Sequence, residues 1–233
     1  MQLVKAGVAY RIAGKGTYVE DMSAGRSIQK SDQSQSTKTI GLIMPEVIER
    51  FSAQTLSAIE TALFTHGYRL VLRQSQHSLG MEEQAIRTML QDGVHGLIVF
   101  PVDNQVYNEE ILRLTLDNFP LVLIDRYLKG IETSAVYSDN LQAGYDLTTL
   151  LLSKKHRKIG VISAPNFNTV SVEERIKGYE NALTEAGVPI DRSLWFTEIL
   201  VDNPVERATA FLQANPDMTG LFAMNAYAGR IAT

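Results

Sequence analysis

Cysteine is absent from the 233-residue chain, which excludes disulfide bonds and thiolate metal sites and fits a reducing compartment. Long apolar runs are also missing, since none approaches the ~18 residues of a membrane-spanning helix. The N-terminus carries Lys5 and Arg11 without the apolar core of a secretory signal. We therefore expect a soluble, cytoplasmic protein that has no membrane partner.

Signatures of catalysis and of cofactor binding are scarce. The four histidines are scattered without metal-ligand spacing, and no serine lies in a Gly-x-Ser-x-Gly elbow. Gly14-Lys15-Gly16-Thr17 does not complete a phosphate loop, because Lys15 is followed by glycine instead of Ser or Thr. We predict no metal, no cofactor and no enzymatic activity, although a pair of carboxylates in a cleft keeps acid–base catalysis open.

The net charge of −4 conceals a basic N-terminal segment. Residues 1–38 hold six Lys/Arg and three Asp/Glu, so they carry +3 and the remaining residues carry −7. A basic segment before an acidic body favours an anionic partner for that segment, and a solvated basic tail explains the charge equally well.

Residues 3–20 predict a β-hairpin. Apolar residues alternate with small or charged ones up to Ile12, and Gly14-Lys15-Gly16 provides the turn. Residues 21–37 are rich in Ser, Gln and Asp and show no periodicity. This second segment is typical of a flexible linker.

Residues 38–130 alternate between apolar strands and amphipathic helices. The expected strands are 39–44, 68–72, 94–100 and 121–124, and the expected helices are 52–66, 81–91 and 109–118. Apolar strands separated by helices are typical of a doubly wound parallel sheet with right-handed crossovers. We predict that these residues form a first α/β lobe.

Residues 131–233 repeat this pattern, so we predict an α/β fold of two doubly wound parallel-sheet lobes. The expected strands are 135–137, 158–164, 195–200 and 220–224, and the expected helices are 141–153, 171–186 and one that begins at Pro204 after an Asn203 cap. Ser171 and Glu174 have the spacing of a capping box. The Ala-Leu pair four residues before Gly67 recurs before Gly187, as two equivalent lobes would require.

The stretch Leu121–Asn140 joins the two predicted lobes. It contains one strand that ends in Asp125-Arg126 and a second short strand that ends in Asp139-Asn140. Ligands of open α/β sheets bind beyond the carboxyl ends of the strands. We therefore expect a small-molecule site between the lobes, with acidic strand ends on both sides.

The residues at the predicted strand ends suit a sugar better than a nucleotide. Carboxylates, amides and a guanidinium bind several hydroxyls at once, and no glycine loop is present to hold a phosphate. Other roles remain open: Asp139 or Asn140 caps a helix, Asp125 and Arg126 form a turn ion pair, and Phe51 belongs to a lobe core. For Arg175 we favour a binding role, because the helix dipole opposes a cation near a helix N-terminus. Neutralisation by Glu173 and Glu174 is the alternative.

From residue 39 to residue 229 the chain resembles the effector-binding domain of the LacI/GalR family. The resemblance is carried by IGLIMPEVIERFSAQTLSAIETALFTHGY, DGVHGLIVFP, LVLIDRYLKG and VEERIKGYENALTEAGV. It implies a periplasmic-binding-protein-like fold and an effector site formed by Phe51, Asp125, Arg126, Asp139, Arg175 and Asn225. The family usually has Asn-Asp near its last strand, whereas this chain has Asn225-Ala226.

Residues 11–19 (RIAGKGTYV) resemble the wing of a GntR-type winged-helix DNA-binding domain. The resemblance implies that Arg11, Lys15 and Gly16 approach the DNA backbone, where cations bind phosphate and glycine permits close contact. It also implies that residues 1–20 are the remnant of a larger DNA-binding head. The second lobe, 131–233, is expected to be incomplete, because the family continues beyond that length.

A GntR-type wing joined to a LacI/GalR-type domain resembles the arabinose-repressor group. This combination implies a homodimeric bacterial repressor that leaves operator DNA when a pentose such as L-arabinose binds. A periplasmic sugar-transport component shares the fold but would need a signal peptide and no wing. The transport component is one alternative to the repressor, and a sugar-processing enzyme is another.

Overall fold

The computed structural model describes residues 9–12, 16–19, 37–102, 107–163, 169–197, 199 and 202–232. The chain divides into two compact units, Met1–Ser36 and Thr37–Thr233. In the first unit, β1 (Ala9–Ile12) pairs antiparallel with β2 (Gly16–Val19), as the sequence predicted. Lys15 and the linker up to residue 36 lie outside the described residues.

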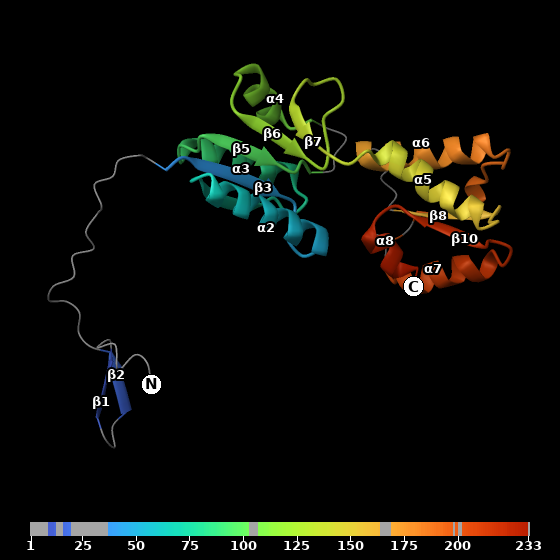
Figure 1. Ribbon diagram of the computed structural model, residues 1–233, viewed down its shortest axis with the longest axis horizontal. Coiled ribbons are helices and arrows are strands. Elements are labelled where there is room, and N and C mark those ends of the chain that lie inside the picture. Colours follow the sequence, from blue (N-terminus) through green and yellow to red (C-terminus); the bar gives the residue numbers. More distant parts are fainter. Residues whose placement is uncertain are drawn as a thin grey trace. The chain divides into compact units, whose positions relative to one another are not determined.

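The second unit begins with a five-stranded parallel sheet of order β4-β3-β5-β6-β7. Its strands are β3 (Thr39–Met44), β4 (Arg69–Gln74), β5 (Gly96–Val99), β6 (Leu121–Ile124) and β7 (Ser134–Val136). The connecting helices are α2 (Arg50–Thr65), α3 (Leu79–Gln91) and α4 (Glu109–Leu116). Figure 1 shows β3, β5, β6 and β7 of this sheet with α2, α3 and α4. The predicted first α/β lobe is therefore present.

Alternation along β3 distributes its side chains between two cores. Ile43 packs with residues of α3 and α4, including Ile86 and Ile111. Leu42 packs on the opposite face, where α2 contributes Leu56. Because successive strand residues point to opposite faces, one short apolar strand supports helices on both sides of the sheet.

One strand belongs to a different sheet from the one that the sequence analysis expected. The strand near residue 135 was assigned to the second lobe, but β7 pairs in parallel with β6 and forms the edge of the first sheet. The link around Gly130 therefore connects two strands of one lobe. The chain passes to the second sheet after Val136, six residues beyond the boundary expected at residue 130.

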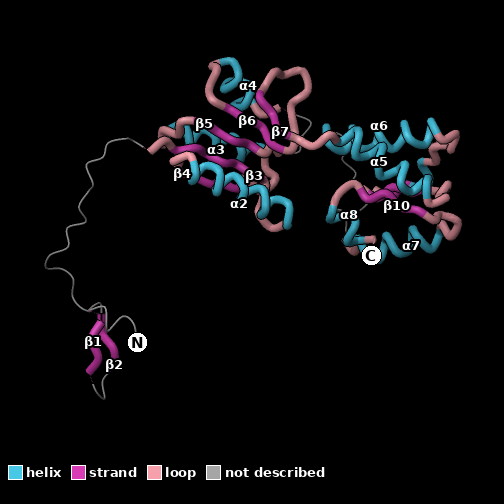
Figure 2. Tube along the Cα trace, in the orientation of Figure 1, coloured by secondary structure: helices cyan, strands magenta, loops and turns pink. Residues whose placement is uncertain are grey.

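The second sheet has three parallel strands in the order β10-β8-β9. They are β8 (Ile159–Ile162), β9 (Trp195–Phe196) and β10 (Gly220–Ala223), with a short 3-10 helix, η1 (Arg192–Leu194), before β9. The helices are α5 (Asn140–Ser153), α6 (Val170–Glu185), α7 (Pro204–Ala214) and α8 (Ala226–Ile231). Figure 2 shows α5 and α6 on one side of β10 and α7 and α8 on the other. One core joins the sheet to α5 and α6, and another joins it to α7 and α8.

The two lobes end equivalent helices in the same way. After α2, Gly67 has φ +75° and the N–H of Tyr68 donates to Leu63 O at 2.9 Å. After α6, Gly187 has φ +65° and the N–H of Val188 donates to Leu183 O, also at 2.9 Å. Glycine adopts this left-handed conformation without a Cβ clash, so the repeated Ala-Leu…Gly spacing has one physical cause.

The predicted capping box was wrong. Helix α6 begins at Val170 with Thr169 as its N-cap, so Ser171 lies inside the first turn and is buried. Helix α7 does begin at Pro204 after Asn203, as predicted, and Asn203 has a left-handed backbone. Among the helices that the structure describes, none has the length and apolar character that a membrane crossing needs.

Candidate functional site

Asp125 follows β6 at the carboxyl edge of the first sheet. Its φ of +66° is unusual for a residue other than glycine, and its N–H donates to Val136 O at 2.8 Å. A left-handed backbone at a non-glycine position costs free energy and is found mainly where the surroundings hold it. The strained turn therefore gives Asp125 a fixed place at the edge of the sheet.

Asp125 and Arg126 form a half-buried charge pair. Arg126 Nε lies 3.6 Å from Asp125 Oδ2, and the two side chains are 20% and 18% exposed. Burial raises the pKa of Asp125, and the positive charges of Arg126 and Arg175 oppose that rise. The expected turn ion pair is thus present, and the charge of Arg175 from the second lobe also acts on Asp125.

Arg126 is held from two further sides. Its Nη1 donates to Pro101 O at 3.1 Å, and its guanidinium lies 5.2 Å from the centre of the Phe100 ring. Phe51 packs edge-on against Phe100 with ring centres 6.4 Å apart. Phe51 lies in the first turn of α2 and is 54% exposed, so it is not a core residue.

Arg175 of α6 bonds to the start of α5 and to the end of β10. Its Nε donates to Asn140 Oδ1 at 2.9 Å, and its Nη1 donates to Met224 O at 2.6 Å. Burial lowers the pKa of Arg175, while Asp125 acts in the opposite direction. Asn140 is only 2% exposed, so Arg175 is fixed by a buried amide.

Two glycines allow this arrangement, because α5 and α6 approach each other very closely. A Cβ at Gly144 would lie 2.2 Å from Arg175 O, and a Cβ at Gly178 would lie 2.1 Å from Leu141 O. Any side chain at either position would force the helices apart. The glycines therefore set the distance between Arg175 and Asn140.

Asp139 and Asn225 both cap helices. Asp139 Oδ1 accepts from Gln142 N at 2.9 Å at the start of α5, and Asn225 Oδ1 accepts from Ala228 N at 2.8 Å at the start of α8. The capping alternative for Asp139 is thus confirmed. Both residues are exposed, and a role in binding stays a prediction for each.

Several side chains near this group were not among the predicted effector contacts. Tyr127 Oη donates to Glu174 Oε1 at 2.7 Å, which raises the pKa of Tyr127 to about 12. Lys129 pairs with Glu173 beside this contact, and Asn140 holds Arg175 as above. Asn140 had been considered only as a helix cap, and no sequence pattern pairs Tyr127 with Glu174, 47 positions away.

The structure thus places Asp125 beside Arg126 and within electrostatic reach of Arg175, which Asn140 holds. Phe51 contacts Phe100, the ring beneath Arg126, while Asp139 and Asn225 adjoin Asn140 and Met224, two partners of Arg175. In the N-terminal unit, Arg11 pairs with Thr17 and Gly16 with Ile12 across the hairpin. Within the described residues, no group of three His, Asp or Glu side chains is arranged to hold a metal ion.

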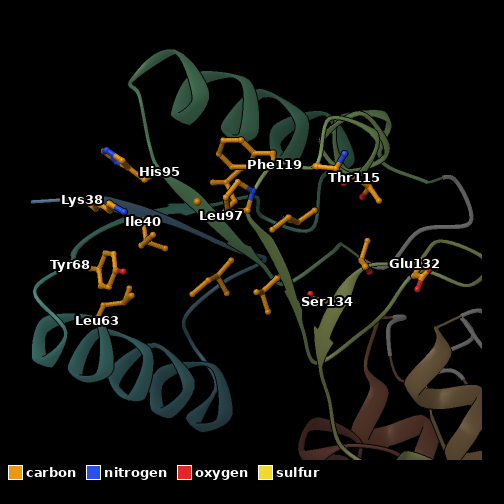
Figure 3. Close-up of a pocket in the computed structure, with 17 residues that line it drawn as sticks. Lys38, Ile40, Leu63, Tyr68, His95, Leu97, Thr115, Phe119, Glu132 and Ser134 are labelled. Carbon is orange, nitrogen blue, oxygen red and sulfur yellow. The ribbon is translucent and has the colours of Figure 1, made fainter.

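A separate pocket of about 810 Å³ lies at the other end of the first sheet. Figure 3 shows Ile40 and Leu97 near the beginnings of their strands, with Leu63 and Tyr68 beside them. These are the amino ends of the strands, whereas ligands of open α/β sheets bind at the carboxyl ends. This pocket is therefore not the expected ligand site.

Two α/β lobes with charged and amide groups at the carboxyl ends of their sheets define a class of ligand-binding proteins. Residues 37–233 match the family described as periplasmic binding proteins and sugar binding domain of the LacI family. The chain belongs to this family. The prediction of a periplasmic-binding-protein-like α/β fold is confirmed.

Two curated relatives are transcriptional regulators by name. The HTH-type transcriptional regulator RegA of Clostridium saccharobutylicum is 28% identical over 196 residues, which cover 83% of this chain and 58% of RegA. The arabinose metabolism transcriptional repressor of Geobacillus stearothermophilus is 29% identical over 221 residues, which cover 91% of this chain and 57% of the repressor. The chain thus spans less than two thirds of the length of both relatives.

Solved structures agree with this assignment. A LacI family transcriptional regulator from Silicibacter pomeroyi superimposes with a TM-score of 0.67 at 26% identity, covering 79% of this chain and 68% of that one. A complex of the transcriptional regulator CelR with cellobiose gives a TM-score of 0.69 at 25% identity, covering 84% and 63%. An ABC transporter solute-binding protein from Mycobacterium smegmatis reaches 0.71 at 16% identity, covering 84% and 69%, which shows a shared fold alone.

Proposed function

We propose that this chain is the effector-binding part of a sugar-responsive bacterial transcriptional regulator. The observation that carries the proposal is the group formed by Asp125 and Arg126 from the first lobe and Arg175 from the second. The group offers both acceptors and forked donors, which match vicinal hydroxyls of an uncharged sugar. Membership in a family that includes LacI-type sugar-binding domains supports the same ligand class.

We infer that the effector is a pentose, with L-arabinose as the first candidate. The arabinose repressor relative covers 91% of this chain, more than the 83% covered by RegA. The hairpin formed by β1 and β2 agrees with the wing expected in the arabinose-repressor group. The six proposed effector contacts are Phe51, Asp125, Arg126, Asp139, Arg175 and Asn225.

The proposed regulator acts by a change in the arrangement of its two lobes. A sugar that binds Asp125 and Arg175 at once favours the arrangement in which both side chains reach it. In a cytoplasmic homodimer, that change alters how two DNA-binding heads meet the operator. Residues 1–20 would supply the wing of each head, with Arg11, Lys15 and Gly16 near the DNA backbone, and residues 21–37 would link it to the lobes.

A periplasmic sugar-binding transport component is the second candidate, since a solute-binding protein shares the fold. The two candidates differ in the N-terminal unit. A transport component has no use for a basic hairpin, whereas a DNA-binding head can use one to contact the phosphate backbone. The β1–β2 hairpin therefore favours the regulator.

A thermal-shift screen of sugars tests the ligand class. The panel comprises L-arabinose, D-ribose, D-xylose, D-galactose and cellobiose, with mannitol and sodium gluconate as a polyol and an anion. We expect L-arabinose to raise the melting temperature most. A rise with gluconate alone would contradict an uncharged sugar effector, and the absence of any rise across the panel would count against the proposed function.

A further inference from the structure

One peptide group of the first lobe lies between a buried carboxylate and the guanidinium of Arg126. Glu82 of α3 is 1% exposed, and its Oε2 accepts from the N–H of Val102 at 2.7 Å. The carbonyl of Pro101 accepts from Arg126 Nη1 at 3.1 Å. Because this N–H and this carbonyl belong to the same peptide unit, the Pro101–Val102 peptide connects the two charges.

The dipole of this peptide group is aligned favourably with both charges. The peptide presents its positive N–H end to the carboxylate and its negative carbonyl end to the guanidinium, so each hydrogen bond strengthens the other. Burial raises the pKa of Glu82, and the hydrogen bonds from Asn108 and Val102 and the charge of Arg126 counteract that rise. A buried carboxylate without such partners would be costly.

The other oxygen of Glu82 is also occupied. Its Oε1 accepts from Asn108 Nδ2 at 2.7 Å, and Asn108 is 4% exposed. Asn108 Oδ1 in turn accepts from the N–H groups of Glu110 and Ile111 at the start of α4. Asn108 therefore fixes Glu82 to the start of α4, and Glu82 in turn fixes the Pro101–Val102 peptide.

Arg126 keeps free hydrogen-bonding capacity. Its Nε is buried and makes no hydrogen bond within the described residues, although it lies 3.6 Å from Asp125 Oδ2. The carbonyl of Pro101 takes one of the five N–H donors of the guanidinium. The orientation of the guanidinium thus depends on the carbonyl of Pro101, which depends on Glu82.

We propose that Glu82 is a positioning residue for effector binding, which orients Arg126 through the Pro101–Val102 peptide without touching the sugar. The proposal rests on the proposed function, because it assigns Arg126 to the effector site. It adds a residue outside the set that the sequence indicated. Through this peptide group, a buried side chain of the first lobe would control the affinity for the sugar.

The test is Glu82→Gln in the full chain. The N–H of Val102 and the Nδ2 of Asn108 donate to different carboxylate oxygens of Glu82. Glutamine replaces one of these oxygens with an NH2 group, which cannot accept, and it carries no charge to orient the peptide. We expect the dissociation constant for L-arabinose, measured by calorimetry, to rise about tenfold, the ratio for one charge-assisted hydrogen bond. Ile86→Val, one turn along the same helix in the same core, provides a control that lowers stability without changing this constant.

A double-mutant cycle separates positioning from general destabilisation. In an Arg126→Met background, Glu82→Gln should have no further effect on L-arabinose affinity, while the fall in melting temperature persists. An equal loss of affinity with and without Arg126 would overturn the proposal. So would an unchanged dissociation constant in the single variant when the wild-type chain binds L-arabinose.

A measurement without ligand distinguishes this proposal from the proposed function. The Nε–H resonance of Arg126, assigned by its absence in Arg126→Met, should shift or broaden in Glu82→Gln and stay in place in Ile86→Val. An unchanged resonance would overturn the positioning role even if no sugar of the panel binds. A shifted resonance together with no sugar response would support the positioning role and contradict the proposed function.

Discussion

The surroundings of Arg175 come from three different elements of the fold. Near the start of an isolated helix, its charge opposes the helix dipole. In the folded chain it bonds to the Asn140 side chain and the Met224 carbonyl, and Asp125 lies within electrostatic reach. The cation is thus compensated by neighbours that come from α5, β10 and β6.

Replacing this residue tests the candidate site directly. We expect Arg175→Ala to weaken L-arabinose binding about 100-fold, because a charged donor and the order of the site are lost together. Titration calorimetry measures the change. Arg113→Ala removes an arginine that is 69% exposed on α4 and serves as the matched control. Unchanged binding in Arg175→Ala would remove this residue from the effector site.

Asp125 predicts a specific pH dependence of stability. Burial raises its pKa above the ordinary 3.8, so the folded state binds the proton more tightly than the unfolded state does. The contribution of Asp125 is then greatest below pH 3.8 and declines as the pH rises through the raised pKa. Asp125→Asn lacks this loss, because the amide does not titrate.

Urea unfolding between pH 3 and pH 7, a range chosen to span ordinary carboxyl pKa values, measures this effect. As the pH rises, we expect the unfolding free energy of Asp125→Asn to increase relative to that of the wild type. Asp217→Asn, an exposed aspartate whose pKa is lowered by Lys158, should show a trend of the opposite sign. A constant difference between Asp125→Asn and the wild type would show that Asp125 is not desolvated.

At the scale of elements, the close pair α5 and α6 determines the shape of the site. The two helices meet at Gly144 and Gly178, where backbone atoms occupy the places of absent side chains. Because the glycines have Arg175 and Leu141 backbone as neighbours, the packing and the site depend on the same two positions.

We expect Gly178→Ala to lower the unfolding free energy by about 1–3 kcal/mol, the usual cost of overpacking. It should also weaken sugar binding, since Arg175 moves away from Asn140. Gly80→Ala in α3 is the control, because a Cβ there meets nothing within 4 Å. That variant should gain up to about 1 kcal/mol from helix propensity. Equal behaviour of both variants in chemical denaturation would contradict the packing argument.

At the scale of the whole molecule, an ion pair joins the start of α2 to α8, 181 positions away. Arg230 donates to both oxygens of Glu49 at 2.9 and 2.5 Å, in a bidentate arrangement. This hydrogen bond lowers the pKa of Glu49. Together with the Tyr127–Glu174 bond, it connects the first lobe to the second.

Charge reversal tests whether this pair favours the sugar-bound arrangement. Arg230→Glu should weaken L-arabinose binding by at most a few-fold, since exposed pairs are screened by solvent. The exchange Glu49→Arg with Arg230→Glu should restore most of the affinity. High salt should reduce the difference between wild type and Arg230→Glu. An exchange that restores nothing would show that the two charges act independently.

Much of this organisation follows from local sequence. Apolar runs separated by amphipathic helices predicted β3 and β6 at their observed bounds and the presence of every helix from α2 to α7. The helix ends at Gly67 and Gly187 depend only on backbone conformation. The repeated Ala-Leu…Gly spacing was therefore enough to predict them. Such features involve neighbours a few positions apart.

The sequence by itself determined the α/β class, the alternation of strands and helices, and most residues near the carboxyl ends of the strands. Only the tertiary structure decided that β7 joins β6, that Asn140 holds Arg175 and that the Pro101–Val102 peptide connects Glu82 to Arg126. The physical reason is the distance along the chain between the residues that interact. Helix and strand patterns arise from contacts within a few residues, whereas sheet edges and buried polar partners arise between segments that only the packed fold brings together.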